Sequence, residues 1–254
     1  MNAKLKRCCV VVSLFAICCI PGCGKKQNKP TEHPIFDCIT HSNEGIVLEM
    51  LKGITNVDSL RNSRGDTPLI VAARRGWNQV VMRLLALHAD VNIHSTNGLY
   101  TPLIAASMFG QLETARILIT NGADVNAVAI FDHTALMGAS ITRPPLVEYL
   151  TKNGAEVNRK MTVVGHTPLF FAAMNNQSAA VETLLEKGAE INGLDRGGRT
   201  PLILACQLGH ADVVRVLLVH HADKSIADPY EGTAIEIAKR KGRQDLVKLL
   251  EDSL

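Results

Sequence analysis

The sequence predicts an all-α repeat solenoid, in which copies of one helix pair stack in a row. The first observation is a segment that recurs at intervals of 34, 33, 33, 33 and 33 residues. The second is its make-up: a short apolar stretch, a turn, and a second apolar stretch with helical spacing. A period this regular indicates stacked supersecondary units. Each copy opens with a threonine, at Thr67, Thr101, Thr134, Thr167, Thr200 and Thr233.

The copy from residue 197 to 223 shows how one unit forms. The Thr200 hydroxyl can cap a helix, and Pro201 suits the first helical position because an N–H there has no helical partner. Gly209 can adopt the left-handed conformation that ends this first helix. A second helix is expected from about Ala211, with its apolar residues on one face. One such pair cannot bury its own apolar surface, so each copy must pack on its neighbours.

The copies share their first and last residues as well as their length. Each opens with TPL or a variant such as TALM, and most close with GADVN or a variant such as GAEIN. This pattern resembles the ankyrin repeat, a unit of two helices and a β-hairpin or loop. The resemblance covers residues 33–254 and implies an ankyrin repeat domain of about seven units, including a degenerate N-terminal cap at 33–62 and a C-terminal cap at 233–254.

One copy departs from the pattern between its two helices. Arg143-Pro144-Pro145 replaces the inter-helix glycine, and the interval from Thr134 to Ala155 is one residue shorter than in the other full copies. Proline cannot continue a first helix but suits the start of a second. The sequence therefore predicts a shortened turn, and the next hairpin is one residue longer, which restores the phase.

Residues 1–22 have the features of a signal peptide, with basic residues near the start and an apolar run from Cys8 to Ile20. A run of this length spans only about 20 Å as a helix, short of the roughly 30 Å hydrocarbon layer. The ending Ile20-Pro21-Gly22-Cys23 resembles a bacterial lipobox, which implies cleavage before Cys23 and lipidation of its thiol. An ordinary signal peptide or an uncleaved anchor is the alternative.

Residues 23–32 are polar, lack apolar periodicity and are expected to form a flexible tether. Lipidation of Cys23 would make the protein a membrane-anchored lipoprotein of the cell envelope. Residue 24 is Gly rather than the Asp that tends to retain a lipoprotein in the inner membrane of enteric-type bacteria. This favours the outer membrane, with the repeats facing the periplasm.

The composition argues against two classes of protein, nucleic-acid-binding proteins and proteins stabilised by disulfides. Without residues 1–22 the chain has 24 basic and 24 acidic side chains, so we expect no nucleic acid partner. Cys38 and Cys206 lie about five repeats apart, and a disulfide requires Cα atoms within about 7 Å. Stability must therefore come from stacking, and we expect a monomer.

In the ankyrin family partners generally bind the concave side, made by the hairpin tips and the exposed end of each first helix. At these positions the central copies of this chain have large apolar side chains, which mark a contact surface when clustered. We predict a protein partner; the alternative is that some of these side chains pack on each other across neighbouring hairpins. The predicted contact residues are Arg74, Arg75, Leu99, Tyr100, Met108, Phe109, Ile130, Phe131, Ile141, Met161, Val163 and Met174.

Motifs for catalysis are missing from the sequence, including G-x-S-x-G, G-x-x-x-x-G-K, H-E-x-x-H and C-x-x-C. We predict no catalytic residue, metal, cofactor or small-molecule substrate, although His133 and His166 precede the opening threonines of adjacent copies and are expected to lie near each other. A lipid-anchored scaffold that binds a protein partner is the favoured function. A secreted ankyrin effector that binds host proteins is the alternative, and an enzyme is disfavoured.

Overall fold

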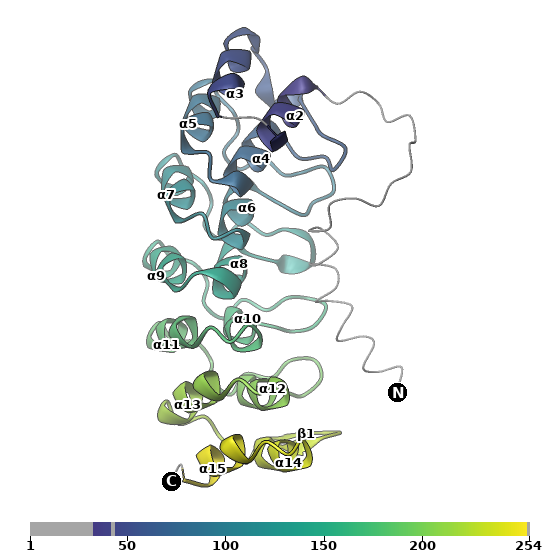
Figure 1. Cartoon of the computed structure of the whole chain (residues 1–254), viewed down its shortest axis with the longest axis vertical. Coiled ribbons are helices and arrows are strands. Elements are labelled where there is room, and N and C mark those ends of the chain that lie inside the picture. The colour runs from purple at the N-terminus through teal and green to yellow at the C-terminus, as the bar shows by residue number, and fades with distance from the viewer. Residues whose placement is uncertain (1–32, 42–43, 253–254) are drawn as a thin grey trace. The chain divides into compact units, whose positions relative to one another are not determined.

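Residues 33–41 and 44–252 are described by the computed structural model. Within them, helix pairs follow one another in a single stack (Figure 1). First helices pack on first helices, and second helices on second helices. The seven pairs are α2 (Pro34–His41) with α3 (Glu44–Met50), α4 (Pro68–Arg75) with α5 (Asn78–Ala86), α6 (Pro102–Met108) with α7 (Leu112–Thr120), α8 (Ala135–Thr142) with α9 (Pro144–Lys152), α10 (Pro168–Met174) with α11 (Ser178–Glu186), α12 (Pro201–Leu208) with α13 (Ala211–Val219), and α14 (Ala234–Arg240) with α15 (Gln244–Asp252).

Short elements connect the pairs. Two 3₁₀ turns, η1 (Leu51–Gly53) and η2 (Val57–Ser59), follow α3 within the N-terminal cap, and η3 (Ile130–Asp132) lies in the hairpin before α8. The last hairpin contains two short antiparallel strands, β1 (Ala227–Asp228) and β2 (Gly232–Thr233). The predicted all-α solenoid with terminal caps is confirmed.

The opening threonine starts the first helix as predicted. Thr200 Oγ1 accepts from the Ile203 N–H at 3.2 Å, and Gly209 ends the helix in the left-handed conformation at φ 83°. Thr233 forms a reciprocal capping box with a glutamate, whereas the Thr167 side chain makes no cap bond. The simple threonine cap recurs at Thr67, Thr101 and Thr134.

The turn in the irregular copy is shortened, as predicted. Arg143 is at once the residue that ends α8 and the residue that precedes α9. Its backbone is extended, with φ −148° and ψ 106°, and Pro144 starts the next helix directly. A deletion in the turn is tolerated because proline fixes a helical φ where a new helix begins.

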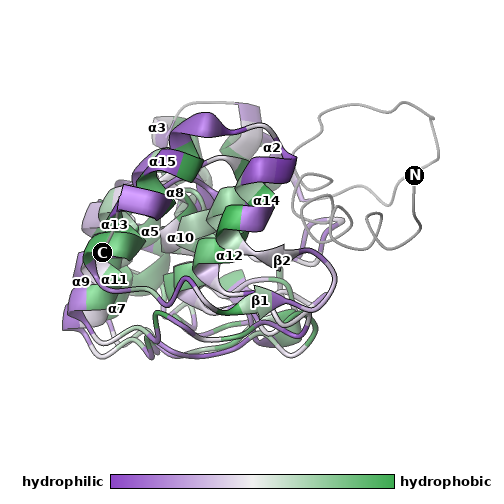
Figure 2. Ribbon diagram, turned by 90° about the horizontal axis from the view of Figure 1, so that it is seen from below, coloured by the Kyte–Doolittle hydropathy of each residue, from purple (hydrophilic) through white to green (hydrophobic). Residues whose placement is uncertain are grey.

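The core runs continuously between the two helix columns. In α12 every residue from Pro201 to Cys206 is buried, because this helix is covered by its neighbours α10 and α14 and by α13. In α13 only one face is buried, through Val213, Val214 and Leu217. Figure 2 shows this division, with hydrophobic sides turned toward each other and hydrophilic sides outward. Each copy is therefore stabilised by the copies next to it.

Asparagine side chains also bridge successive copies, on the loops that follow the second helices. Asn126 Nδ2 donates to the Gly154 carbonyl at 2.9 Å, and Asn126 Oδ1 accepts from the Glu156 N–H at 2.8 Å. An amide has the donor and the acceptor that this bridge requires, which explains the asparagine of the closing motif. The same pair of bonds is made by Asn92 and Asn158.

Candidate partner-binding face

The hairpins project from the column of first helices, on the side away from the second helices (Figure 1). Backbone bonds join their tips from one copy to the next. The bonds run from Thr96 N to Gly65 O at 2.9 Å, from Ile130 N to Gly98 O at 2.8 Å, from Thr162 N to Phe131 O at 3.3 Å, and from Arg196 N to Val164 O at 2.9 Å.

The ends of the first helices contact these hairpins at several points. The Arg74 guanidinium, at the end of α4, lies 5.0 Å from the centre of the Tyr100 ring on the next hairpin and 5.7 Å from the Phe109 ring after α6. Near the other end of the stack, Gln207 in α12 donates to Glu231 at 3.3 Å. We call the surface made by the hairpins and the first-helix ends the hairpin face.

Large apolar side chains are exposed on this face. Phe109, Ile130, Phe131 and Val163 have between 39 and 48% of their surface accessible. Arg75 is also exposed, and five further predicted residues are half-buried. The half-buried ones are Arg74, Leu99, Met108, Ile141 and Met174.

Tyr100 and Met161 are not on the surface, so for these two the expectation of exposure is wrong. Tyr100 is 6% exposed, because Arg74 covers its ring. Met161 is 3% exposed, because it packs into a small cluster with Met137 and Phe171. Here the alternative of packing across neighbouring copies holds.

Two exposed leucines on the hairpin face, Leu194 and Leu208, are absent from the predicted contact residues. Leu208 ends α12, and Leu194 precedes the buried Asp195 in the hairpin that leads into α12. Leu208 lies three periods after Phe109, and Leu194 lies two periods after Val128. The signal that could have found them was periodicity applied to every copy rather than to the central ones alone.

Phe131 has an uncommon backbone conformation. Its φ of 63° and ψ of 24° are left-handed, and Asp132 follows with φ 61°. Left-handed geometry is costly for residues with a Cβ and is an outlier for a bulky side chain. In the preceding hairpin the left-handed residue is a glycine, Gly98, at φ 70°. The chain therefore holds an exposed phenylalanine where glycine would fit without strain.

His133 and His166 are both buried beneath the hairpins, and both rings lie nearly perpendicular to the Phe171 ring, at 5.7 and 6.0 Å between centroids. Burial lowers the pKa of His133 to about 4, so this ring is neutral at pH 7. Burial would raise the pKa of Asp195, but hydrogen bonds from His166 and Arg199 outweigh it and lower the pKa to about 2. These groups join neighbouring hairpins within the core.

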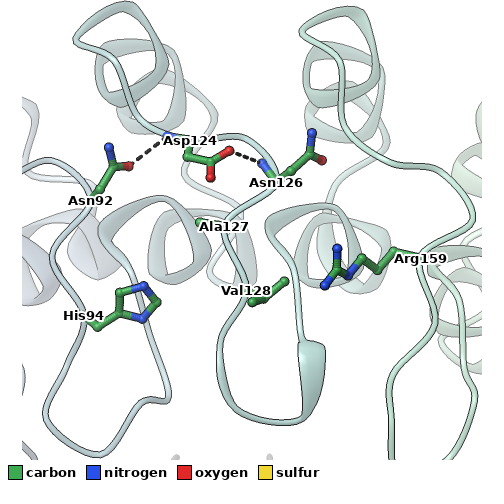
Figure 3. Close-up of a pocket in the computed structure, with 7 residues that line it drawn as sticks. All are labelled: Asn92, His94, Asp124, Asn126, Ala127, Val128 and Arg159. Carbon is green, nitrogen blue, oxygen red and sulfur yellow. Dashed lines mark hydrogen bonds between the residues drawn. The ribbon is translucent and has the colours of Figure 1, made fainter.

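A shallow cavity of about 490 Å³ opens between the loops of the second, third and fourth hairpins (Figure 3). Its polar groups are largely engaged. Arg159 pairs with Asp132 at 3.2 Å and with Glu156 at 3.3 Å, and two asparagines belong to the bridges between copies. The lining residues are Asn92, His94, Asp124, Asn126, Ala127, Val128 and Arg159.

Family models described as ankyrin repeats match most of the chain. A three-copy model matches residues 35–129 and 128–195, and a many-copy model matches residues 184–238. The chain belongs to the ankyrin repeat family. Ankyrin repeats are generally non-enzymatic modules that bind proteins, so the coarse prediction of an interaction domain is supported.

Curated relatives share the ankyrin repeats with this chain. A Danio rerio protein whose name contains the term palmitoyltransferase ZDHHC13 is 30% identical over 146 residues, which cover 57% of this chain and 22% of the relative. The "Ankyrin repeat and SAM domain-containing protein 6" of Rattus norvegicus is 30% identical, with 55% and 16% covered. The human "Ankyrin repeat and SOCS box protein 6" is 29% identical, with 65% and 40% covered. The chain thus spans less than half of each of these relatives.

Cys23 and the leader lie outside the residues that the structure describes, so lipidation stays a prediction. Within residues 33–41 and 44–252, no helix combines the length and apolar character needed to cross a membrane. The same residues contain no group of three or more His, Cys, Asp or Glu placed to hold a metal ion. Cys38 and Cys206 are both free thiols.

Proposed function

We propose that this ankyrin repeat protein is a lipid-anchored scaffold that faces the periplasm and binds a protein partner through its hairpin face. The observation that carries the proposal is Phe131, which combines a left-handed backbone with a side chain that is 45% exposed. Strained residues persist where the surrounding structure holds them, and they cluster at functional sites.

The energetics of Phe131 favour a role in recognition. A left-handed residue with a Cβ costs about 1–2 kcal/mol relative to the right-handed form. Burial of just over half of the residue returns about 1 kcal/mol, a gain of similar size to the cost, while nearly half of the residue still faces solvent. Glycine, which lacks a Cβ, adopts a left-handed conformation without this cost. The aromatic ring is therefore better explained by a contact outside the chain.

Three more exposed apolar side chains lie on the hairpin face. Ile130 precedes Phe131 on the same hairpin, Val163 lies on the next hairpin, and Phe109 lies at the end of α6. The backbone bond from Thr162 to Phe131 places those two hairpins side by side. Aromatic side chains in such clusters are typical anchors of protein interfaces.

The proposed lipid anchor is inferred from the lipobox-like sequence that ends at Cys23. Acylation at Cys23 would hold the protein stably on a membrane, because several acyl chains bind far more strongly than one. Residues 24–32 would then separate the repeats from the bilayer and leave the hairpin face accessible to proteins of the periplasm.

The binding proposal is tested with a Phe109→Ala, Phe131→Ala double variant. We expect it to lose the cross-linked partner that the wild-type protein captures from cell envelopes, while it keeps a cooperative thermal transition. The matched control is Met82→Ala, Val219→Ala, which removes two exposed apolar side chains from α5 and α13. Retained capture by the hairpin-face variant, or equal loss by the control, contradicts the proposal.

The anchoring proposal is tested by metabolic labelling with an alkyne fatty acid. Wild-type protein should be labelled and should fractionate with the outer membrane, and Cys23→Ala should be unlabelled. Label that persists in Cys23→Ala, or wild-type protein released into the medium without label, removes the lipoprotein assignment and favours a secreted protein.

A further inference from the structure

Charge is unevenly divided between the hairpin face and the opposite side of the stack. The hairpins and the first helices from α4 onward, at residues 61–75, 94–109, 127–142, 159–175, 193–208 and 226–241, contain 11 basic and 6 acidic side chains. The segments between and around them, within residues 44–252, form the second helices and the loops that follow, and contain 10 basic and 16 acidic side chains. A chain close to neutral overall is therefore basic on the side where the hairpins project.

The six carboxylates of these hairpins and first helices, from residue 61 onward, all have partners within the chain. Asp228 accepts from the backbone N–H groups of Tyr230 and Glu231, and Glu236 accepts from the backbone of Thr233. The other four form ion pairs. These are Asp66 with Arg74 at 2.7 Å, Asp132 with Arg159 at 3.2 Å, Asp195 with Arg199 at 2.7 Å, and Glu231 with Arg240 at 2.9 Å.

Three exposed cations on the hairpins have side chains that make neither an ion pair nor a hydrogen bond with the described residues. They are Arg64, Lys160 and Arg196, each on a different hairpin. Along the stack, Phe131 lies between the hairpins of Arg64 and Lys160, Val163 shares the hairpin of Lys160, and Arg196 lies on the next hairpin. These positive charges thus lie before, between and after the exposed apolar side chains.

We propose that the hairpin face binds an acidic polypeptide segment whose apolar side chains contact Phe109, Phe131 and Val163 and whose carboxylates pair with Arg64, Lys160 and Arg196. This inference rests on the proposed function and specifies the chemistry of the partner. Complementary charge speeds association and excludes wrong partners, while the apolar contacts supply most of the affinity.

Other anionic partners fit the face less well. Binding to an anionic membrane through side-chain charge takes clusters of about four to eight Lys or Arg, more than the three cations here. A nucleic acid presents a phosphate at every residue and is matched by a continuous basic surface. Separated cations with apolar side chains between them match a polypeptide that alternates carboxylates and apolar groups.

The test is selection of a random 16-residue peptide library, displayed on phage, against the full chain captured in detergent micelles. We expect the enriched peptides to contain a clear excess of Asp and Glu over Lys and Arg, around a cluster of apolar residues. One enriched peptide is then synthesised with a fluorophore, and its affinity is measured by anisotropy at low and at high salt.

Matched charge variants locate the effect. The first triple variant is Arg64→Gln, Lys160→Gln, Arg196→Gln. Its affinity for the peptide should fall about tenfold at low salt and much less at high salt, because exposed ion pairs contribute little and are screened by salt. Arg83→Gln, Lys187→Gln, Lys248→Gln removes the same charge from exposed positions on and next to the second helices and should leave the affinity unchanged. Anionic phosphatidylglycerol vesicles and duplex DNA serve as competing probes.

The outcomes separate this inference from the proposed function. Enriched peptides that are neutral or basic, no enrichment at all, or equal effects of the two triple variants overturn it. So does tight binding of vesicles or DNA through the three cations. Peptides that need Phe109 and Phe131 but not the cations would retain the scaffold function and refute the acidic partner. Peptides that need neither set would refute both.

Discussion

Nη2 of Arg74 lies 2.7 Å from Oδ2 of Asp66, and this ion pair links the hairpin before α4 to the end of that helix. Asp66 is fully buried, and only 15% of the Arg74 side chain is accessible. The same guanidinium covers Tyr100 and reaches Phe109. Arg74 is therefore a support for the hairpin face more than a contact residue.

Replacement of Arg74 by Met should lower the free energy of unfolding by about 3 kcal/mol, because it leaves a buried carboxylate unpaired. Arg74→Lys should also destabilise, since lysine lacks the planar group that stacks on two rings. Urea denaturation measures both. Arg75→Met is the control, with a loss below about 1 kcal/mol expected at this exposed position. Equal losses at positions 74 and 75 would contradict the structural role.

Glycine at position 131 should give a more stable protein than alanine at that position, by about 0.5–1 kcal/mol. Both variants remove the ring, but only glycine relieves the left-handed strain at φ 63°, and its higher unfolded-state entropy offsets part of the gain. Thermal denaturation of Phe131→Gly and Phe131→Ala measures the difference. If Phe131 serves recognition, the two variants should lose the partner equally. An alanine variant as stable as the glycine variant would show that the strain is absent in solution.

Stability should fall as the pH is lowered from about 6.5 to about 4. His133 has a pKa of about 4 in the folded protein against 6.5 for an unperturbed histidine, so only the unfolded chain binds a proton between these values. This difference in pKa contributes about 3 kcal/mol to the free energy of unfolding, a contribution that is present above pH 6.5 and lost by about pH 4. Urea titrations across this range, on the wild type and on His133→Gln, measure the slope.

His88→Gln, at an exposed position, is the control for this pH dependence and should leave the slope unchanged. Below pH 4 a second loss is expected, because the Asp195 carboxylate, with a pKa of about 2 against 3.8 for an unperturbed aspartate, contributes stability that disappears as it is protonated. A slope that is the same in His133→Gln and in the wild type would rule out His133 as its source.

Replacement of Asn126 by Ala should lower the free energy of unfolding by about 1–2 kcal/mol, although the residue is only half-buried. It removes the bonds to Gly154 and Glu156 and leaves a backbone donor and acceptor without their partner. Asn121→Ala is the matched control, because its amide bonds only within its own helix. Chemical denaturation measures both, and a larger loss at position 121 would contradict the bridging role.

Cys206 should resist thiol reagents in the native protein. Burial raises the pKa of its thiol to about 12, whereas Cys38 is only half-buried. Reaction with iodoacetamide at about pH 8, followed by peptide mass spectrometry, should label Cys38 first and Cys206 only near the unfolding transition. Early labelling of Cys206 would show that the copies around α12 open independently of the rest.

The sequence was most informative where structure is local and repeated. A threonine, a proline and a glycine at fixed offsets define the start and end of α12, and the same cues recur in phase in other copies. Pro144 likewise predicted the shortened turn, because its effect depends only on the backbone next to it. These cues determine the helices and, through the period, their stacking.

The candidate site was predicted less completely, because exposure depends on the neighbouring copy. Tyr100 is buried by Arg74, a residue 26 positions earlier, and no local pattern announces that contact. The strain at Phe131 is equally invisible, since a hairpin tip allows several turn geometries. The division of charge emerges only after alternate segments of a neutral sequence are assigned to opposite sides of the stack.

The backbone bonds that join neighbouring hairpin tips run between peptide groups. Exchange of the side chains there leaves this chain of bonds in place, so the scaffold can be retargeted to a new ligand by a few surface substitutions without a redesign of its interior.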